Sequence, residues 1–269
     1  MPSIEWNKQK WAKEHNWSGP DKDHGNEWSD SFGSATMHWY AFILPRLFHF
    51  LPNAACQNSR ILEIAPGHGR WTQFLLNHCQ KLIGYDISEN SIAYCNDIFR
   101  DHVSRGAAEF HVTDGLTLCE ENDSVDLVFS FDSLVHVERD VINSYLAHLT
   151  KCLKPGAFAF LEHSNLGAYP ALCEGYNDLP YNARGTTVSA DTVWADAHEN
   201  GLTTLIQEGL NHETEHMNNE LIDCISVIQK PIKQNITKTK PVFLSNSYYP
   251  TLGEITRRFA RPYESYDVS

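Results

Sequence analysis

The sequence is short of positive charge, of long apolar runs and of paired cysteines. Lysine and arginine number 21 against 34 aspartates and glutamates, a formal charge of −13, so a broad surface for nucleic acid or anionic membranes is not expected. No apolar run is long enough to span a bilayer, and the start MPSIEWNKQKWAKEH lacks a signal-peptide core. The 7 cysteines include no CxxC pair, which is typical of reduced proteins. We therefore expect a cytoplasmic protein without a membrane span.

What the sequence does contain is material for one large core, with 42% hydrophobic residues over 269 positions. From Arg60 onward, short apolar runs alternate with amphipathic stretches. This alternation predicts an α/β fold, a Rossmann-like, seven-stranded and mostly parallel sheet with helices on both faces. The strands are expected at 60–64, 81–86, 109–112, 125–131, 157–163, 202–207 and 221–229, and the main helices at 70–79, 88–100, 140–153 and 189–200.

The chain is expected to divide into three regions. Residues 1–50 form an N-terminal arm, rich in tryptophan, followed by a helix that Ser34 caps, and we expect this region to cover a ligand site. Residues 51–230 form the main domain, with a turn-rich insertion at 164–189 that forms a lid after the fifth strand. Residues 231–269 are a polar tail without a clear element.

The strongest functional signal is RILEIAPGHGRW, residues 60–71, in which a buried strand runs into a glycine turn and then a helix. Gly67 and Gly69 let the backbone approach a ligand, and the helix start adds free N–H groups. Asp86 ends the next strand, where a carboxylate can take both hydroxyls of a ribose. The dinucleotide pattern GxGxxG does not fit, and Glu63 inside the strand would repel a pyrophosphate. The pattern favours a nucleoside ligand that carries a positive centre and an ammonium group.

Polar residues follow the later strands in the same way. Asp114 and Gly115 follow the third strand, where a carboxylate can accept from an adenine amino group. The fourth strand leads into SFDSLVHVE, which contains Asp132 and His136, and His163 ends the fifth strand. Because open α/β sheets bind ligands at the carboxyl ends of their strands, these side chains are expected at one site.

Residues 60–163 resemble the core of class I S-adenosylmethionine-dependent methyltransferases, with Ala65 at the first glycine of the family turn. A closer resemblance is to a bacterial branch assigned to sugar O-methylation. It rests on EWSDSFGS (27–34), APGHGRWTQ (65–73), FSFDSLVHVE (129–138) and HSNLGAY (163–169). The resemblance implies S-adenosylmethionine as cofactor and methyl transfer to a sugar hydroxyl, free, nucleotide-linked or in a glycan. The residues expected to bind the cofactor are Trp28, Trp39, Glu63, Ala65, Gly67, Gly69, Arg70, Asp86, Ile87, Asp114, Gly115 and Phe131.

A sugar hydroxyl needs a base as it attacks, and histidine titrates nearest neutral pH. We expect His163 to be this base, with His136 and Asp132 orienting it or the acceptor. The opposite assignment of the two histidines stays open.

Other functions also stay open. They are methyl transfer to a non-sugar hydroxyl or amine, and a non-catalytic protein that binds the same cofactor. HETEH, residues 212–216, has the spacing of a zinc-protease motif, but its flanks lack the apolar stripe of a helix, so no metal ligands are predicted. A divalent cation near Asp132 is not expected. The expected partner is a small molecule or glycan, and self-association is not decided by the sequence.

Overall fold

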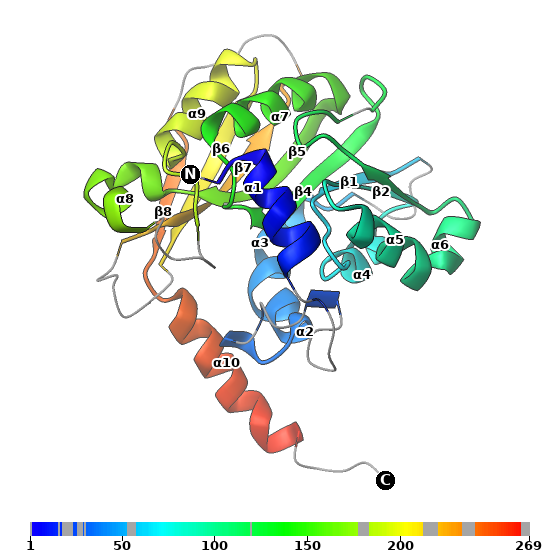
Figure 1. Ribbon diagram of the computed structural model, residues 1–269, viewed down its shortest axis with the longest axis horizontal. Helices are drawn as coiled ribbons and strands as arrows, with labels where there is room; N and C mark the ends of the chain where they lie inside the picture. Colours follow the sequence, from blue (N-terminus) through cyan, green and yellow to red (C-terminus); the bar gives the residue numbers. More distant parts are fainter. Residues whose placement is uncertain are drawn as a thin grey trace.

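The computed structural model describes residues 2–15, 17, 24–25, 29, 31–52, 58–118, 120–176, 183–211, 220–232 and 240–264. Its centre is an eight-stranded sheet of order β3-β2-β1-β4-β5-β7-β6-β8 (Figure 1). Neighbouring strands from β3 to β5 are parallel, whereas β7 runs antiparallel to both β5 and β6. The strands are β1 (Arg60–Ile64), β2 (Lys81–Asp86), β3 (Ala108–Val112), β4 (Val125–Leu134), β5 (Leu153–Ser164), β6 (Thr203–Leu210), β7 (Asp223–Gln229) and β8 (Val242–Asn246).

This architecture confirms the predicted Rossmann-like α/β fold but has eight strands instead of seven. The additional strand, β8, lies in the tail for which no element was predicted, and it pairs in parallel with β6. The helix α10 (Tyr249–Glu264) follows it and extends away from the body of the molecule (Figure 1). The sequence did not reveal β8 because its five residues form a strand only against the free edge of β6, a contact between distant segments.

Helices cover both faces of the sheet and enclose two hydrophobic cores. Residues of α7 and α9 pack on one face, and residues of α2, α3, α4 and α5 pack on the other. No helix in the described ranges is both long and apolar enough to cross a membrane. The α-helices before α10 are α1 (Ile4–Gln9), α2 (Ala35–His38), α3 (Leu44–Leu47), α4 (Thr72–Leu75), α5 (Glu89–Ile98), α6 (Arg100–Ser104), α7 (Arg139–Cys152), α8 (Pro170–Tyr176) and α9 (Ala190–Glu199).

Serine caps fix the starts of three helices where the sequence predicted them. Ser34 accepts a hydrogen bond from the backbone of Met37, and Ser88 accepts one from Ser91 at the start of α5. Ser189 begins α9 with a reciprocal pair of bonds to Thr192. Each such cap contributes about 1 kcal/mol by satisfying an N–H group that the helix leaves free.

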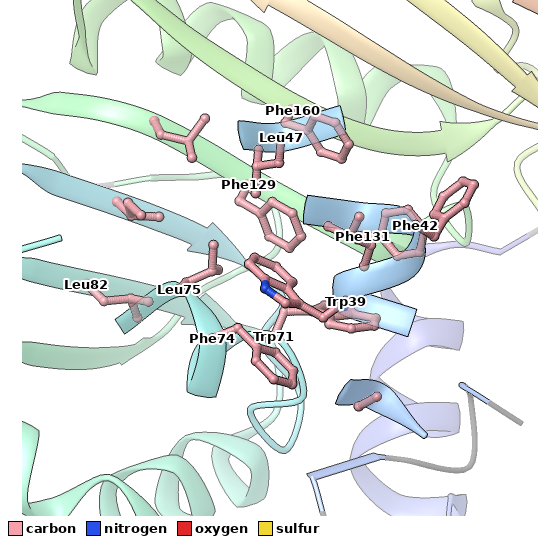
Figure 2. Packing of buried hydrophobic residues seen from close by; sticks show 14 of the residues in the cluster. Trp39, Phe42, Leu47, Trp71, Phe74, Leu75, Leu82, Phe129, Phe131 and Phe160 are labelled. Carbon is pink, nitrogen blue, oxygen red and sulfur yellow. The ribbon is translucent and has the colours of Figure 1, made fainter. Parts of the chain in front are cut away.

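An aromatic cluster fills the core beneath α2 and the π-helix Trp39–Ile43 (Figure 2). Trp39 is only 1% exposed and stacks on Phe74, with ring centroids 5.1 Å apart. Phe129 of β4 stacks on Phe160 of β5 at 5.8 Å. Truncating a core aromatic of this size costs about 3–5 kcal/mol of folding free energy. The structure thus places Trp39 among the residues that stabilise the fold.

The N-terminal region lies across the end of the central strands (Figure 1). The first part of this region consists of α1 and the π-helix Lys10–Glu14. Asn7 donates from Nδ2 to the backbone oxygen of His136, at 2.7 Å, and the ring of Trp11 lies 5.0 Å from the ring of His136. These contacts join the first helix to the loop after β4, more than a hundred residues away along the chain.

Candidate active site

A cavity of about 280 Å³ opens where the carboxyl ends of the central strands meet the N-terminal region. One end is formed by the loops after β1, β2 and β3, and the other by the ends of β4 and β5. Trp11 and Trp17 close it from the N-terminal side, and Tyr249 of α10 contributes to the wall.

The glycine turn after β1 forms the floor of the first end. Ala65, Gly67 and Gly69 all have positive φ angles, of 56°, 56° and 80°. Ala65 lies in this strained region at a cost of about 1–2 kcal/mol. A Cβ atom on Gly67 would lie 3.3 Å from the Trp17 ring at the cavity wall, whereas one on Gly69 would lie 2.5 Å from the ring of Phe99. Gly67 therefore keeps the cavity open, and Gly69 allows close packing against α5.

Asp86 holds this turn in place from the end of β2. Its Oδ2 accepts from the backbone N–H of Gly67 at 3.0 Å, and its Oδ1 accepts from that of Ser88 at 2.8 Å. Burial raises the pKa of Asp86 to about 6, against the opposing effect of these backbone bonds. Asp86 and its neighbour Ile87 line the cavity, and the carboxylate oxygens retain lone pairs for ligand hydroxyls.

Glu63 lies beneath the turn and does not line the cavity. It is 1% exposed and accepts a hydrogen bond from the Thr72 hydroxyl at 2.5 Å. Burial raises the pKa of Glu63 to about 8, so the carboxyl is mostly neutral at pH 7. A positively charged ligand group nearby would favour its ionised form.

Arg70 offers the cavity an unused hydrogen-bond donor. Its Nη2 pairs with Oδ2 of Asp132 at 2.6 Å. Its Nη1 is buried and has no hydrogen-bond partner in the described part of the chain, although the arginine is only 7% exposed. A buried donor left without a partner costs about 1–3 kcal/mol. The site is therefore suited to a ligand that brings an anionic or carbonyl oxygen to Arg70, such as the carboxylate of an amino acid.

At the opposite end of the cavity, His136 has the arrangement of a base. Its Nδ1 lies 2.6 Å from the carbonyl oxygen of Ala183, which can only accept, so Nδ1 carries the proton. Nε2 then keeps its lone pair and has no partner among the described side chains. Burial lowers the pKa of His136, which keeps the ring neutral and able to accept a proton.

His163 is placed differently. It is fully buried and does not line the cavity. Its Nδ1 donates to the carbonyl of Ser164, and its Nε2 accepts from the hydroxyl of Ser226, both at 2.8 Å. Burial lowers the pKa of His163 to about 4. The Nε2 bond thus joins β5 to β7, the Nδ1 bond stays within β5, and neither nitrogen is directed to a ligand.

The remaining expected residues are divided between the cavity and its surroundings. Gly115 and Phe131 line the cavity, as do Ala65 and Asp132. Asp114 does not, and its Oδ1 instead accepts from the backbone of Leu116 and Thr117, both at 2.8 Å. Trp28 and the HETEH segment lie outside the described residues. The described residues contain no group of three or more histidine, cysteine or acidic side chains that could hold a metal ion.

The sequence analysis did not single out Glu162, Arg184 or Tyr249 of the cavity wall. For Glu162 the sequence did contain a signal. Side chains alternate along a strand, so Glu162 faces the opposite side of the sheet from His163, the side of Phe158 and Phe160. Arg184 forms two hydrogen bonds to Asp223, at 2.6 and 2.7 Å. Neither Arg184 nor Tyr249 lies near a motif, and only the fold brings them to the site.

Part of the chain matches a known protein family. Residues 61–156 match the family model described as a methyltransferase domain. A search of curated proteins finds no significant match.

Solved structures share the fold at low sequence identity. An S-adenosylmethionine-dependent methyltransferase from Mesorhizobium loti aligns with a TM-score of 0.57 at 17% identity, covering 74% of this chain and 99% of that one. One from Methanosarcina mazei aligns with a TM-score of 0.53 at 16% identity, covering 70% of this chain and 98% of that one. A putative sarcosine dimethylglycine methyltransferase from Galdieria sulphuraria gives 0.54 at 13% identity, covering 74% and 86%.

The unpaired Arg70 donor and the open turn at Gly67 fit a nucleoside that carries an amino acid, which is the chemistry of S-adenosylmethionine. Residues 61–156 thus match a methyltransferase domain, and the fold is one that the chain shares with S-adenosylmethionine-dependent methyltransferases.

Proposed function

We propose that this enzyme transfers the methyl group to a hydroxyl of a sugar, with His136 as the general base. The observation that carries the proposal is the chemistry of the far end of the cavity. Asp132, His136 and Glu162 line it together, and all three are hydrogen-bonding side chains. A polyhydroxylated acceptor can satisfy several such groups at once, whereas an apolar acceptor would leave them without partners.

The donor is expected to bind along the first end of the cavity. Asp86 is positioned to accept from ribose hydroxyls, and the backbone at Gly115 and Ile87 to border the base. Arg70 would hold the carboxylate of the amino-acid portion through Nη1. When bound, S-adenosylmethionine supplies a methyl group on a positively charged sulfur atom.

His136 would take the proton of the reacting hydroxyl on Nε2 as the new C–O bond forms. The Ala183 carbonyl fixes the tautomer that this step needs, because it holds the ring proton on Nδ1. Trp11 packs on the same ring and helps to exclude water from the site. His163, to which the sequence analysis gave the same role, is proposed to hold β5 against β7.

An acceptor screen tests this proposal. The purified protein is incubated with S-adenosylmethionine and panels of free sugars, nucleotide sugars, phenols and amines, and products gaining one methyl group are detected by mass spectrometry. We expect methylated sugars. Methylation of phenols or amines with none of sugars would contradict the sugar assignment and leave the methyltransferase activity in place.

A non-sugar acceptor is the second candidate, and one observation favours it. The cavity is also walled by indole and phenyl rings, among them Trp11, Trp17 and Phe131, which suit an acceptor with an apolar or cationic portion. An amine acceptor would place its charge against such rings. The same screen distinguishes the two candidates, because it includes both classes under identical conditions.

A further inference from the structure

Glu162 is a buried carboxyl at the acceptor end of the cavity, and the proposed proton transfer to His136 does not use its charge. It lies two residues before the end of β5, is 2% exposed and lines the cavity. Its Oε2 accepts from the backbone N–H of Asp132 at 2.5 Å. Its Oε1 has no hydrogen-bond partner among the described residues. The structure thus holds one carboxyl oxygen at the cavity that is available to a ligand or to water.

The charged groups around Glu162 are already matched with each other. Asp132 on β4 pairs with Arg70, and Asp223 on β7 pairs with Arg184, both at 2.6 Å. Each arginine therefore has its own aspartate, and Glu162 is the acid left over. The nearby titratable groups from the other elements are Tyr249 on α10, His38 on α2, which contacts Tyr249, and His136 after β4.

This excess of acid favours the protonated form of Glu162 over the ionised one. Burial is the largest cause that raises the pKa of Glu162 well above its usual value, and the negative charges of Asp132 and Asp223 add to it. A positive charge arriving in the cavity would lower that pKa again, because opposite charges favour the ionised carboxyl.

The sheet order puts Asp86 and Glu162 on opposite sides of the cavity, so that a donor bound between them would bring its charge toward Glu162. Asp86 ends β2, and the order β2-β1-β4-β5 puts Glu162 three strands away. Neighbouring strands are about 4.8 Å apart, so the strands that carry the two carboxyls lie about 14 Å from each other. A donor held by Asp86 at its ribose and passing over Gly67 extends toward β4 and β5, with its amino-acid end and sulfur beyond the ribose.

We propose that the carboxyl of Glu162 is the counter-charge of the donor sulfonium, giving up its proton when the cationic donor binds and taking one back when the neutral product remains. The inference rests on the proposed donor site. On binding, the Glu162 proton goes to solvent and the cavity gains a carboxylate beside the cation. After transfer the sulfur is neutral, the acceptor proton has left through His136, and Glu162 regains a proton from solvent. The site therefore favours the cationic donor over the spent product.

Calorimetry on the full chain tests this without any acceptor. The dissociation constants of S-adenosylmethionine and S-adenosylhomocysteine are measured from pH 6 to pH 8.5. We expect the preference for S-adenosylmethionine to increase with pH, by up to about tenfold for each pKa unit that the donor removes from Glu162. Binding of S-adenosylmethionine should also release protons, seen as a heat that depends on the buffer, in excess of that for S-adenosylhomocysteine.

Two variants locate the effect. Glu162→Gln keeps the shape and the hydrogen bond from Asp132 but cannot ionise, so the preference should no longer depend on pH while the affinity for S-adenosylhomocysteine is kept. Glu109→Gln is the matched control, because Glu109 lies on β3 outside the cavity and is half-exposed beside Lys81. The pH dependence of its ligand preference should equal that of the parent protein.

The outcomes separate this inference from the proposed function. A pH-independent preference in the parent protein overturns the inference, whether or not Glu162→Gln folds. A preference for S-adenosylmethionine that still increases with pH in Glu162→Gln also overturns the inference and assigns the counter-charge to Glu63 or Asp86. In both cases the two ligands still bind, and the proposed function stands. If neither ligand binds, the proposed function fails together with the inference.

Discussion

The two ends of the cavity are built in different ways. The donor end uses strand-end residues from a short stretch of chain, among them Gly67, Asp86 and Gly115, all in the parallel half of the sheet. The acceptor end combines Trp11 of the N-terminal region with Glu162 of β5, and adds Arg184 and Tyr249 from farther along the chain. One end is thus a local pattern repeated at successive strands, and the other is assembled by tertiary contacts.

The difference extends to how each end is held. At the donor end, both carboxylate oxygens of Asp86 are fixed by backbone N–H groups. At the acceptor end, side chains fix one another through the pairs Arg70–Asp132 and Arg184–Asp223. We expect changes at the donor end to affect cofactor binding, and changes at the acceptor end, Glu162 apart, to affect turnover with little effect on cofactor affinity.

The largest effect is expected from replacing the two histidines separately with glutamine. His136→Gln should lower kcat by about 10²- to 10⁴-fold with an acceptor identified in the screen, because the base is lost, and should leave the affinity for S-adenosylhomocysteine unchanged. His163→Gln is the matched control and should instead lower the melting temperature, since a buried bond to Ser226 is disturbed. Equal turnover losses in both variants would contradict the assignment of the base.

At the donor end, Asp86→Asn should weaken binding of S-adenosylhomocysteine by about 10- to 100-fold in a calorimetric titration. An amide cannot accept from both Gly67 and Ser88, so one buried N–H loses its partner, at about 1–3 kcal/mol. In the parent protein, cofactor affinity should fall as the pH drops below about 6, where Asp86 becomes protonated.

Asp114→Asn is the control for Asp86→Asn, because Asp114 also follows a strand but lies outside the cavity. Its effect on cofactor affinity should be less than about threefold. A loss as large as that of Asp86→Asn would mean that the adenine end of the site reaches Asp114, as the sequence predicted.

Trp17 joins the two ends, and its removal should have a smaller effect. Its ring stacks on His68, with centroids 4.3 Å apart, and its Nε1 donates to the backbone of Trp11. Trp17→Ala should weaken cofactor binding by about tenfold or less, because one aromatic contact contributes about 0.5–1.5 kcal/mol. The matched control is Trp194→Ala on α9, outside the cavity, which should bind the cofactor as the parent does.

The last effect concerns stability instead of binding or turnover. Because the folded-state pKa of Glu63 is about 8 against an ordinary 4.5, the parent protein should lose stability as the pH rises from 5 to 8. Glu63→Gln keeps an oxygen for Thr72 and cannot ionise. The melting temperature of this variant relative to the parent should therefore increase over that range and level off above pH 8. A constant difference would contradict the raised pKa.

Sequence reasoning was most successful where function follows from neighbours in the chain. The strand before Gly67, the turn itself and the capped helix α5 after β2 were predicted because apolar runs, glycines and capping signals are all local. Sequence reasoning was less successful in placing tryptophan and histidine side chains. Trp39 was expected at the cofactor and lies in the core, since an aromatic side chain suits either place and its neighbours in space decide. For His136 and His163, only the partner of each ring nitrogen distinguishes a base from a structural bond.

The amino-acid sequence by itself determined the α/β fold and the glycine turn at the end proposed for the donor, because periodicity and turn chemistry act over a few residues. The tertiary structure alone decided which histidine faces the cavity, that Glu162 lies beside it without a cation of its own, and that Tyr249 from the far end of the chain completes the wall. These placements depend on burial and on contacts between distant segments, and no local pattern encodes either.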